Sequence, residues 1–291
     1  MTNFVFSNIF TTFVRIFAKR TMEPKKVLFI SQEIMPYLPE TEMSYIGRLL
    51  PQGVLERGKD IRTFMPKFGG INERRNQLHE VIRLSGANLI IDGVDHPLLI
   101  KVASIQAARM QVYFIDNEEY YTRKGILNSA EDGTFFDDND ERAIFFTRGI
   151  FETVKKLQWN PDLIYCQGWF SSLVTLYLKK EYANDPAFNK AKIVYSCYDD
   201  QFEGSLDSKF ASKMVSDNIS LEDVAAVKEP THLNINKMAI DYADGIIIHS
   251  PQVSQEVIEY AKSSGKPMTS YTDRDTYVET YDKFFDSILE Q

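Results

Sequence analysis

The sequence predicts an α/β fold, with a Rossmann-like, mainly parallel sheet, helices on both faces and one antiparallel hairpin. Short apolar runs alternate along the chain with longer segments of helical period, which is the pattern of repeated βαβ units. The short runs are apolar at nearly every position, as expected of strands covered on both faces. With 291 residues, of which 44% are hydrophobic and 25% charged, the chain can bury a full core.

Eight of the short runs are predicted to be strands, because they are rich in β-branched and aromatic residues. They comprise residues 26–31, 60–65, 88–92, 98–104, 110–116, 162–166, 192–197 and 245–249. Residues 93–97, which begin with a glycine and end with a proline, are predicted to form the turn of an antiparallel hairpin between the third and fourth runs.

Six segments with apolar residues at helical spacing are predicted to be helices: 42–57, 140–157, 171–182, 233–242, 252–261 and 277–289. Gly58 is expected to end the first as a C-cap. The acidic run 137–141 precedes the second, where the positive end of the helix dipole favours negative charge. The last helix is expected to pack back on a single domain that spans residues 22–291.

Residues 1–21 are aromatic, contain no acidic residue and include Lys19 and Arg20 near their end. They are expected to lie outside the fold, either as a disordered extension upstream of a start at Met22 or as a peripheral amphipathic helix. The segment lacks the features of a signal peptide, and its apolar run is too short and too interrupted to predict an integral membrane span.

The composition argues against several classes of function. A net charge of -8 without a basic stripe makes nucleic acid an unexpected partner. Cys166 and Cys197 lie in apolar runs, as free cysteines of a cytoplasmic protein do. No glycine-rich phosphate loop, histidine pair at metal spacing or nucleophile elbow is present, so neither a metal nor a cofactor is predicted.

Five segments taken together, residues 26–37, 50–68, 111–121, 160–169 and 237–251, carry a family resemblance in their order and spacing. The chain resembles the N-terminal half of bacterial glycogen synthases and plant starch synthases. That family uses two Rossmann-like domains of the GT-B type to transfer glucose from ADP-glucose to an α-1,4-glucan. The resemblance therefore implies one half of such a glycosyltransferase, acting in glycogen biosynthesis.

The resemblance breaks at the family's functional motifs. The family's Lys-Thr-Gly-Gly-Leu-Ala-Asp corresponds to residues 39–45 of this chain. Here Pro39 replaces the lysine, Thr41 and Glu42 replace the two glycines, and Tyr45 replaces the aspartate. The family's lysine and glycines favour a diphosphate, whereas Pro39 has neither charge nor N–H, and acidic side chains repel phosphate.

Two further motifs depart as well. The family's His-X-His-Asp-Trp-His corresponds to residues 165–170 of this chain. Gln167 and Gly168 replace the second histidine and the aspartate, and Trp169 is the one residue of the motif that remains. The family's Thr-Val-His-Asn corresponds to residues 196–199, where Tyr198 replaces the histidine that contacts the transferring sugar. No catalytic residue is therefore assigned in this chain.

Aromatic residues near the expected strand ends are candidates for stacking on the sugar rings of a glucan, namely Tyr37, Tyr45, Trp169, Phe170, Tyr198 and Phe202. The alternative interpretation is that these rings fill the volume left by lost functional groups.

Three functions follow from the resemblance and the lost motifs. The preferred one is a glycogen-synthase-like pseudoenzyme, which binds an α-glucan or another glycogen enzyme without independent catalysis. The first alternative is an active glycosyltransferase completed by a separate donor-binding domain. The second is a non-catalytic protein-interaction module.

Overall fold

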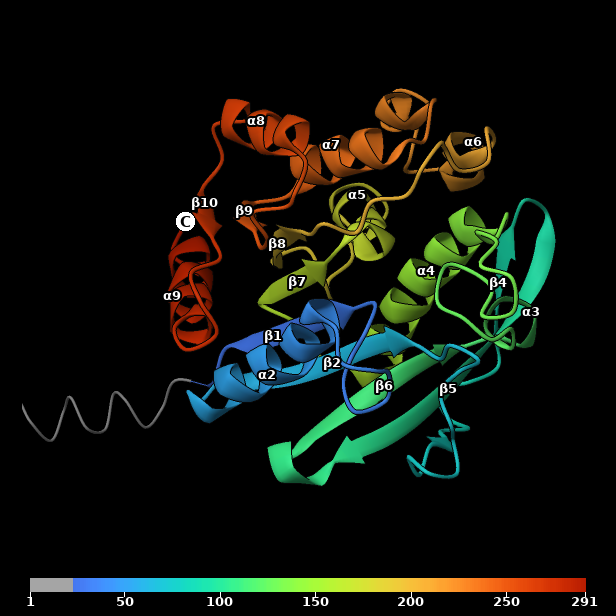
Figure 1. The fold of residues 1–291 in the computed structure, drawn as a ribbon, viewed down its shortest axis with the longest axis horizontal. Helices are drawn as coiled ribbons and strands as arrows, with labels where there is room; N and C mark the ends of the chain where they lie inside the picture. Colours follow the sequence, from blue (N-terminus) through green and yellow to red (C-terminus); the bar gives the residue numbers. More distant parts are fainter. Residues whose placement is uncertain (1–22) are drawn as a thin grey trace, which may run out of the picture.

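The computed structural model describes residues 23–291, and its centre is one sheet with the strand order β10-β9-β8-β7-β1-β2-β6-β5-β3 (Figure 1). The strands from β10 to β6 run parallel, while β5 runs antiparallel to β6, β3 and β4. Their bounds are β1 Lys26–Ser31, β2 Asp60–Pro66, β3 His79–Glu80, β4 Ala87–Ile91, β5 Val94–Ile105, β6 Met110–Asp116, β7 Leu163–Gln167, β8 Lys192–Cys197, β9 Gly245–Ile248 and β10 Met268–Ser270.

The strand order reverses between β1 and β7. From β1 the chain adds β2 and then β6 on one side, and it crosses to the other side of β1 to add β7, β8, β9 and β10. Adjacent crossover connections diverge at such a point, so a crevice opens beyond the carboxyl ends of the two strands. Ser31 ends β1 and Gln167 ends β7, and these two residues are paired in the register. The candidate site is therefore expected beyond them.

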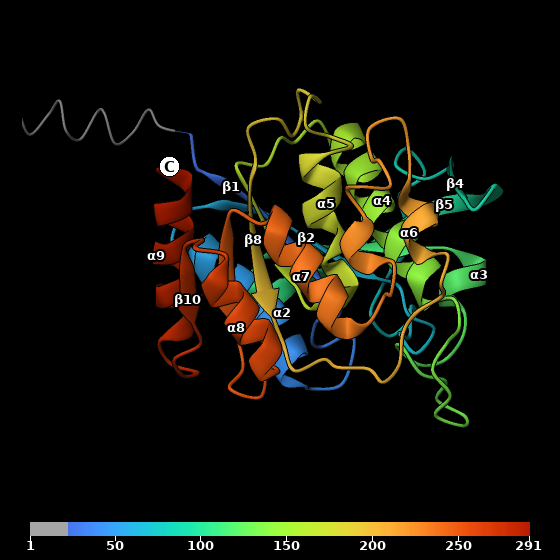
Figure 2. The ribbon, with the colours of Figure 1, turned by 90° about the horizontal axis from the view of Figure 1, so that it is seen from above.

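Helices cover the sheet in two groups (Figures 1 and 2). On one face α2 (Glu42–Glu56) contacts α9 (Tyr277–Leu289). On the other, α4 (Asn139–Leu157), α5 (Leu173–Lys179), α7 (His232–Tyr242) and α8 (Gln255–Ser263) contact one another in that order. Two short helices, α3 (Glu118–Tyr121) and α6 (Phe210–Met214), and the 3-10 turns η1 (Gln106–Ala108), η2 (Trp169–Ser171) and η3 (Ala225–Val227) lie in the connections. The Rossmann-like class predicted from the sequence is confirmed.

The last helix, α9, packs closely on α2 and the sheet. Phe285 is fully buried, and its ring lies 5.7 Å from that of Tyr165 and 6.2 Å from that of Phe29. Lys59, the residue before β2, binds the carboxylates of Asp282 at 2.7 Å and Asp286 at 2.9 Å. Apolar contact and ion pairing thus hold α9 against α2 and the central strands β1 and β7.

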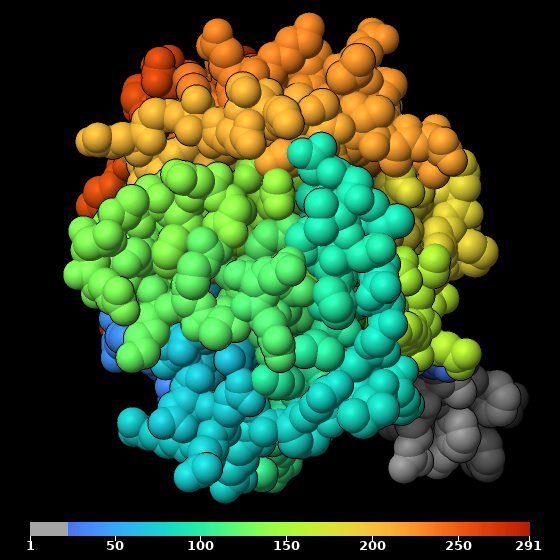
Figure 3. Space-filling view, turned by 90° about the vertical axis from the view of Figure 1, so that its right-hand side faces the viewer, coloured from blue at the N-terminus to red at the C-terminus, as the bar shows by residue number. Residues whose placement is uncertain are grey.

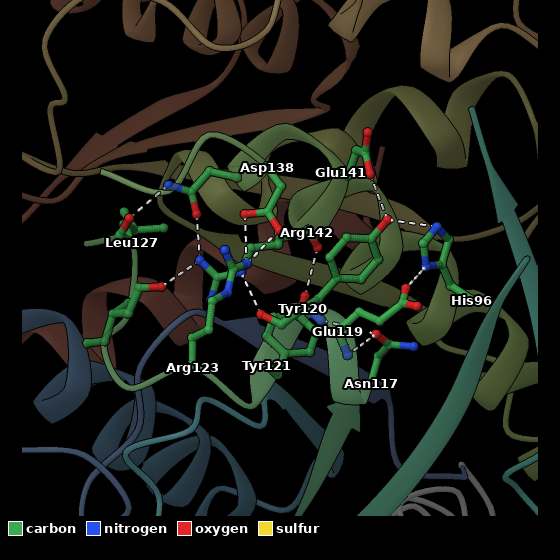
Figure 4. Close-up of polar contacts among 12 residues, drawn as sticks. His96, Asn117, Glu119, Tyr120, Tyr121, Arg123, Leu127, Asp138, Glu141 and Arg142 are labelled. Atoms are coloured by element: carbon green, nitrogen blue, oxygen red, sulfur yellow. Dashed lines mark hydrogen bonds and ion pairs between the residues drawn. The ribbon is translucent and has the colours of Figure 1, made fainter. Parts of the chain in front are cut away.

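A buried polar network holds the segment between α3 and α4 (Figure 4). The guanidinium of Arg142 is fully buried and donates to the backbone oxygens of Tyr120 at 3.0 Å and Ile126 at 2.8 Å, and to Oδ1 of Asn139 at 2.5 Å. Asp138 pairs with Arg123. The connection between α3 and α4 is therefore pinned from its interior.

The same network reaches the β4–β5 hairpin through His96. Its Nδ1 lies 2.6 Å from Glu119, and its Nε2 lies 3.0 Å from the hydroxyl of Tyr120, which donates to Glu141. The hairpin accordingly lies against α3 and α4, on the face shown in Figure 3.

Most predicted elements are confirmed, including the antiparallel hairpin of β4 and β5, but the predicted bounds of its turn are wrong. Residues 93–97 do not form a five-residue turn, because Val94 to Pro97 already belong to β5. Asp92 and Gly93 alone make the turn, with φ of 46° and 80°, a left-handed pair that matches the twist of a tight hairpin.

Other boundaries differ for local reasons. Ser254 caps α8, so that helix begins at Gln255 rather than at residue 252. Gly58, with φ of 94°, ends α2 as expected. In the acidic run, Asp140 and Glu141 do lie in the first turn of α4, but Asp138 makes no capping hydrogen bond. The sequence analysis missed β3, β10, α3 and α6, which are five residues long or shorter.

Both cysteines are free and buried. Within residues 23–291, no helix combines the length and the apolar character needed to cross a bilayer. The predictions made for residues 1–21 lie outside the described residues.

Candidate functional site at the carboxyl ends of β1, β7 and β8

The N-terminus of α2 lies beyond β1, and its own side chains cap it. Thr41 Oγ1 accepts the backbone N–H of Ser44 at 3.0 Å, and Ser44 Oγ accepts the backbone N–H of Thr41 at 2.8 Å. This capping box satisfies two of the N–H groups that a helix terminus could otherwise offer to a phosphate. Pro39, just before the cap, contributes no N–H.

An arginine from the other end of the chain pairs with the acidic residues at this terminus. Arg274, between β10 and α9, donates to Glu42 Oε2 at 2.8 Å and lies 3.7 Å from Glu40 Oε1. Its guanidinium also stacks over the ring of Tyr45, with Cζ 4.2 Å from the ring centre. Acidic side chains and a paired cation therefore occupy the mouth of the site.

Behind this mouth, Gln167 links three elements. Its Nε2 donates to the carbonyl of Met43 at 2.7 Å and to the hydroxyl of Tyr198 at 3.0 Å. Both Gln167 and Tyr198 are buried, and burial raises the pKa of Tyr198 well above its usual value, so the hydroxyl stays protonated. These two residues hold the end of β7 against α2.

The carboxylate of Asp200 lies beside Gly168. It accepts the backbone N–H of Trp169 at 2.7 Å, and its other oxygen lies 2.9 Å from Nε2 of His232. A Cβ atom on residue 168 would come within 2.5 Å of Asp200 Oδ2. The family's motif has an aspartate at the position of Gly168. In this chain Asp200, from the loop after β8, places its carboxylate where the Cβ of that aspartate would lie.

A second carboxyl group, that of Glu33, follows β1 and is almost completely buried. It accepts hydrogen bonds from Thr41 Oγ1 at 2.8 Å and from Gln32 Nε2 at 3.2 Å. Burial raises its pKa, the two hydrogen bonds oppose that rise, and the negative charge of Asp200 adds to it. The reversal point of the sheet thus contains two neighbouring carboxyl groups.

His249 follows β9 and completes the site. Its ring stacks on Tyr198 at 4.4 Å, and its Nδ1 lies 2.7 Å from the hydroxyl of Tyr281. Its Nε2 faces Glu42 Oε1 at 3.8 Å. Burial lowers the pKa of the imidazole to about 4, although the carboxylate of Glu42 acts in the opposite direction, so the ring is neutral at pH 7.

The six candidate aromatic residues divide by exposure. Tyr37, Trp169, Phe170 and Tyr198 are each less than 9% exposed and pack against other side chains. Tyr45 and Phe202 are partly exposed. Phe202 stacks on Phe135 at 5.4 Å and contacts Trp169 at 4.9 Å. In this conformation only Tyr45 and Phe202 offer ring surface for stacking on a sugar.

The sequence analysis missed five residues of this site, namely Glu33, Asp200, His232, His249 and Arg274. A signal existed for Glu33 and Asp200, because each follows a predicted strand by two or three residues and the carboxyl ends of parallel strands share one edge. No local signal marked Arg274, since it lies in an irregular segment 232 residues from Glu42.

The groups gathered here are chemically distinctive. Carboxylates, tyrosine hydroxyls and a neutral imidazole can exchange hydrogen bonds with the hydroxyls of a sugar. The guanidinium of Arg274 is already paired. Within residues 23–291, no group of three or more histidine, cysteine, aspartate or glutamate side chains is arranged to hold a metal ion.

Comparison with known proteins identifies relatives of this chain. Residues 26–269 match the family model described as the starch synthase catalytic domain. The glycogen synthase of Chlorobium limicola is 30% identical over 233 residues, covering 80% of this chain and 47% of that protein. The glycogen synthase of Chlorobaculum parvum is 31% identical over 241 residues, covering 82% and 48%. The chain thus spans about half the length of the curated relatives it matches.

Among solved structures, the catalytic domain of starch synthase IV from Arabidopsis thaliana, bound to ADP and acarbose, superposes with a TM-score of 0.69. The two chains are 16% identical, and the match covers 88% of this chain and 53% of the other. At this identity the similarity concerns the fold alone. It supports the Rossmann-like α/β fold of the chain.

Proposed function

The chain belongs to the family of the starch synthase catalytic domain, and from this membership we propose that it is a glucan-binding, acceptor-side domain without independent catalysis. The proposed ligand is an α-glucan, by analogy with the glycogen synthases that it resembles. The proposed partners are that glucan and another enzyme of glycogen metabolism, and the proposed location is the cytoplasm.

One observation carries the proposal, namely the pairing of Arg274 with Glu42 and Glu40 at the N-terminus of α2. The family's motif places a lysine and glycines there, which suit a diphosphate. In this chain Thr41 and Ser44 cap the helix, and the nearby cation is bound to carboxylates. A sugar nucleotide would have to displace the arginine and approach Glu42, so electrostatic repulsion opposes its binding.

Loss of catalysis follows from the same charges. Glucosyl transfer develops negative charge on the leaving diphosphate, and removing one group that stabilises such charge typically costs about 100-fold or more in rate. Glu40 and Glu42 would add repulsion to that loss. Glucan binding needs no such charge, because aromatic faces and neutral hydrogen-bonding groups suffice.

Calorimetry with maltoheptaose, ADP-glucose and ADP tests the proposal. We expect maltoheptaose to bind and both nucleotides to give no saturable heat. Phe202→Ala should weaken maltoheptaose binding, whereas Leu221→Ala, a change at an exposed leucine in the connection between α6 and η3, should leave it unchanged.

The other outcomes favour the competing functions. Binding of ADP-glucose at micromolar concentration would favour an enzyme completed by a separate donor-binding domain. Absence of binding to any of the three ligands, and to glycogen in a sedimentation assay, would favour a protein-interaction module.

A further inference from the structure

A hollow of about 400 Å³ lies among the helices α4, α5 and α6 and the edge strand β4. α4 contacts each of the other three elements, so the hollow lies where they meet (Figure 1). The residues from 23 to 291 that line it include none of the candidate site at the carboxyl ends of β1, β7 and β8. Its size is within the range of small-molecule sites, about 300 to 1,000 Å³.

One wall of the hollow carries a tyrosine hydroxyl without a partner. Tyr177, on α5, is 4% exposed, and its hydroxyl makes no hydrogen bond to any residue in the described part of the chain. Unlike the hydroxyl of Tyr165, that of Tyr177 is not fully covered, so it opens into the hollow. A largely buried hydroxyl is unfavourable without a hydrogen bond, and here only the contents of the hollow can supply one.

Arg148, on α4, lines the hollow near Tyr177 and keeps most of its N–H donors free. Its Nη1 donates to the backbone oxygen of Ile90 at 2.5 Å, the one hydrogen bond of this side chain within residues 23–291. Burial raises the pKa of Tyr177, the guanidinium of Arg148 opposes that rise and the carboxylate of Glu181 adds to it. Both charged groups therefore lie near the unpartnered hydroxyl.

Two carboxylates of the lining supply acceptors. Glu152 lies one turn after Arg148 on α4, and its contact with the hydroxyl of Tyr182 is long, at 3.5 Å. Glu181 accepts the hydroxyl of Ser216 through Oε2, and its Oε1 makes no hydrogen bond to the residues that the structure describes. The hollow thus presents free acceptors as well as free donors.

The charges of the lining decide which class of ligand fits. Lys155 and Lys213 are already paired, with Asp185 at 3.1 Å and Asp140 at 2.7 Å, whereas Arg148 pairs with no carboxylate of the described residues. An anion would approach two carboxylates, a cation would approach a guanidinium, and either would lose hydration on entry. A neutral ligand rich in hydroxyls avoids both costs, because each hydroxyl can donate to a carboxylate and accept from a guanidinium or a tyrosine.

The apolar part of the lining suits the ring of a sugar. Ile90 and Val215 both line the hollow and are 56% and 42% exposed. A pyranose carries hydroxyls at its edge and C–H groups on its faces, so it can pack on these aliphatic side chains while its hydroxyls form hydrogen bonds. Adjacent ring hydroxyls also match the paired N–H groups of a guanidinium and the paired oxygens of a carboxylate.

We propose that the hollow lined by Arg148, Glu152, Tyr177 and Glu181 binds a neutral pyranose, as a second sugar site in the helix layer. Arg148 and Tyr177 donate to the ring hydroxyls, and the two glutamates accept from them. That this sugar is a glucose unit of an α-glucan rests on the proposed function, whereas the site itself does not.

Calorimetric titration of the full chain with maltotriose, inorganic phosphate and the zwitterion 4-aminobutanoate tests the site. We expect maltotriose alone to bind. Tyr177→Phe, which keeps the ring and removes no hydrogen bond of the fold, should weaken this binding about fivefold, the effect of one hydrogen bond. Tyr113→Phe is the matched control, because Tyr113 is 7% exposed, lies in β6 outside the hollow and should leave binding unchanged.

Arg148→Gln should weaken maltotriose binding about tenfold or more, because hydrogen bonds to a charged group are stronger. Arg83→Gln, at an exposed arginine outside the hollow, serves as its control. Urea unfolding of the four variants shows whether each retains the fold. Equal maltotriose affinities for Tyr177→Phe and Tyr113→Phe, or for the two arginine variants, would overturn the inference.

Phe202→Ala separates this site from the one at the carboxyl ends of the strands. Maltotriose binding that depends on Phe202 and on neither Tyr177 nor Arg148 would support the proposed function and overturn the second site. Binding that depends on Tyr177 and Arg148 but not on Phe202 would support the second site and count against a glucan at the strand ends. Preferential binding of phosphate or 4-aminobutanoate, or binding of none of the probes, would also overturn the inference.

Discussion

The carboxylate of Asp200 occupies the space into which a side chain at Gly168 would extend. An ideal Cβ on residue 168 would lie 2.5 Å from Asp200 Oδ2 and 2.8 Å from Met43 Cε. The backbone at Gly168 also has a φ of 74°, which side chains other than glycine rarely adopt. Asp200 can bind Trp169 N–H and His232 only because residue 168 has no side chain.

Gly168→Ala is therefore expected to destabilise the protein by about 2 to 4 kcal/mol, the sum of a left-handed backbone penalty and a steric clash. Gly133→Ala is the matched control, because Gly133 has a φ of 75° and open space around its Cα. It should cost about 1 kcal/mol from the backbone alone. Urea unfolding measures both changes, and equal losses would contradict the steric role of Asp200.

Arg142→Lys should cost about 3 kcal/mol or more in the free energy of unfolding. A lysine cannot reproduce the three hydrogen bonds that the guanidinium donates to Tyr120, Ile126 and Asn139, and a buried charge with fewer partners is unfavourable. Arg83→Lys, a change at an exposed arginine, should stay within about 0.5 kcal/mol. Similar unfolding midpoints for the two variants would show that the network in Figure 4 contributes little.

The stability of the protein should fall between pH 6.5 and about pH 4 because of His249. Burial lowers the pKa of this imidazole in the folded state to about 4 from its ordinary 6.5. The unfolded chain therefore binds a proton in that window and the folded protein does not, so acidification favours unfolding. The largest contribution of the group is about 3 kcal/mol, reached below pH 4.

His249→Gln should remove this part of the pH dependence, whereas His79→Gln, at an exposed position, should retain it. Thermal unfolding midpoints measured at half-unit steps of pH compare the two variants. If the curve of His249→Gln kept the same slope as that of the unmodified chain, the groups responsible would lie elsewhere.

The fold was largely predictable because strands that are buried on both faces appear in the sequence as continuous apolar runs. The strands 26–31, 110–116 and 192–197 were predicted at the observed bounds, and α9 likewise. The predicted boundaries were wrong where the backbone conformation depends on strand twist or on a contact with a distant part of the chain. The tight turn at Asp92 and Gly93 was hidden by the proline at residue 97, which still fits within β5.

The candidate site was less predictable, because loops bring its groups together from distant positions. Comparison of the chain's segments with the family's motifs showed that Gly168 replaces an aspartate. It gave no sign that Asp200 would fill the space of that side chain. The same method identified Glu42 as an acidic replacement and could not reveal that Arg274 pairs with it. The sequence shows which functional groups of the family's motifs are absent. Only the structure shows that side chains from other loops occupy their positions.

The pairing of Lys59 with Asp282 leads to a test of how α9 is held. Lys59→Met should destabilise the protein by about 3 kcal/mol, because it leaves the carboxylate of Asp282 buried without its closest cation. Arg57 lies 3.9 Å from the same carboxylate and limits the loss. Lys283→Met, which breaks an exposed pair with Glu279 on the same helix, should cost less than about 0.5 kcal/mol.

The double variant Lys59→Met with Asp282→Leu separates charge from packing. Replacing both members of a buried ion pair by apolar side chains of similar size is often neutral, so we expect most of the stability lost in Lys59→Met to return. Limited proteolysis should then cleave near Arg274 in the single variant and spare the double variant, because only the single variant weakens the attachment of α9. Cleavage of both variants at the same rate would show that the apolar contacts of Phe285, rather than the ion pair, hold the helix on the sheet.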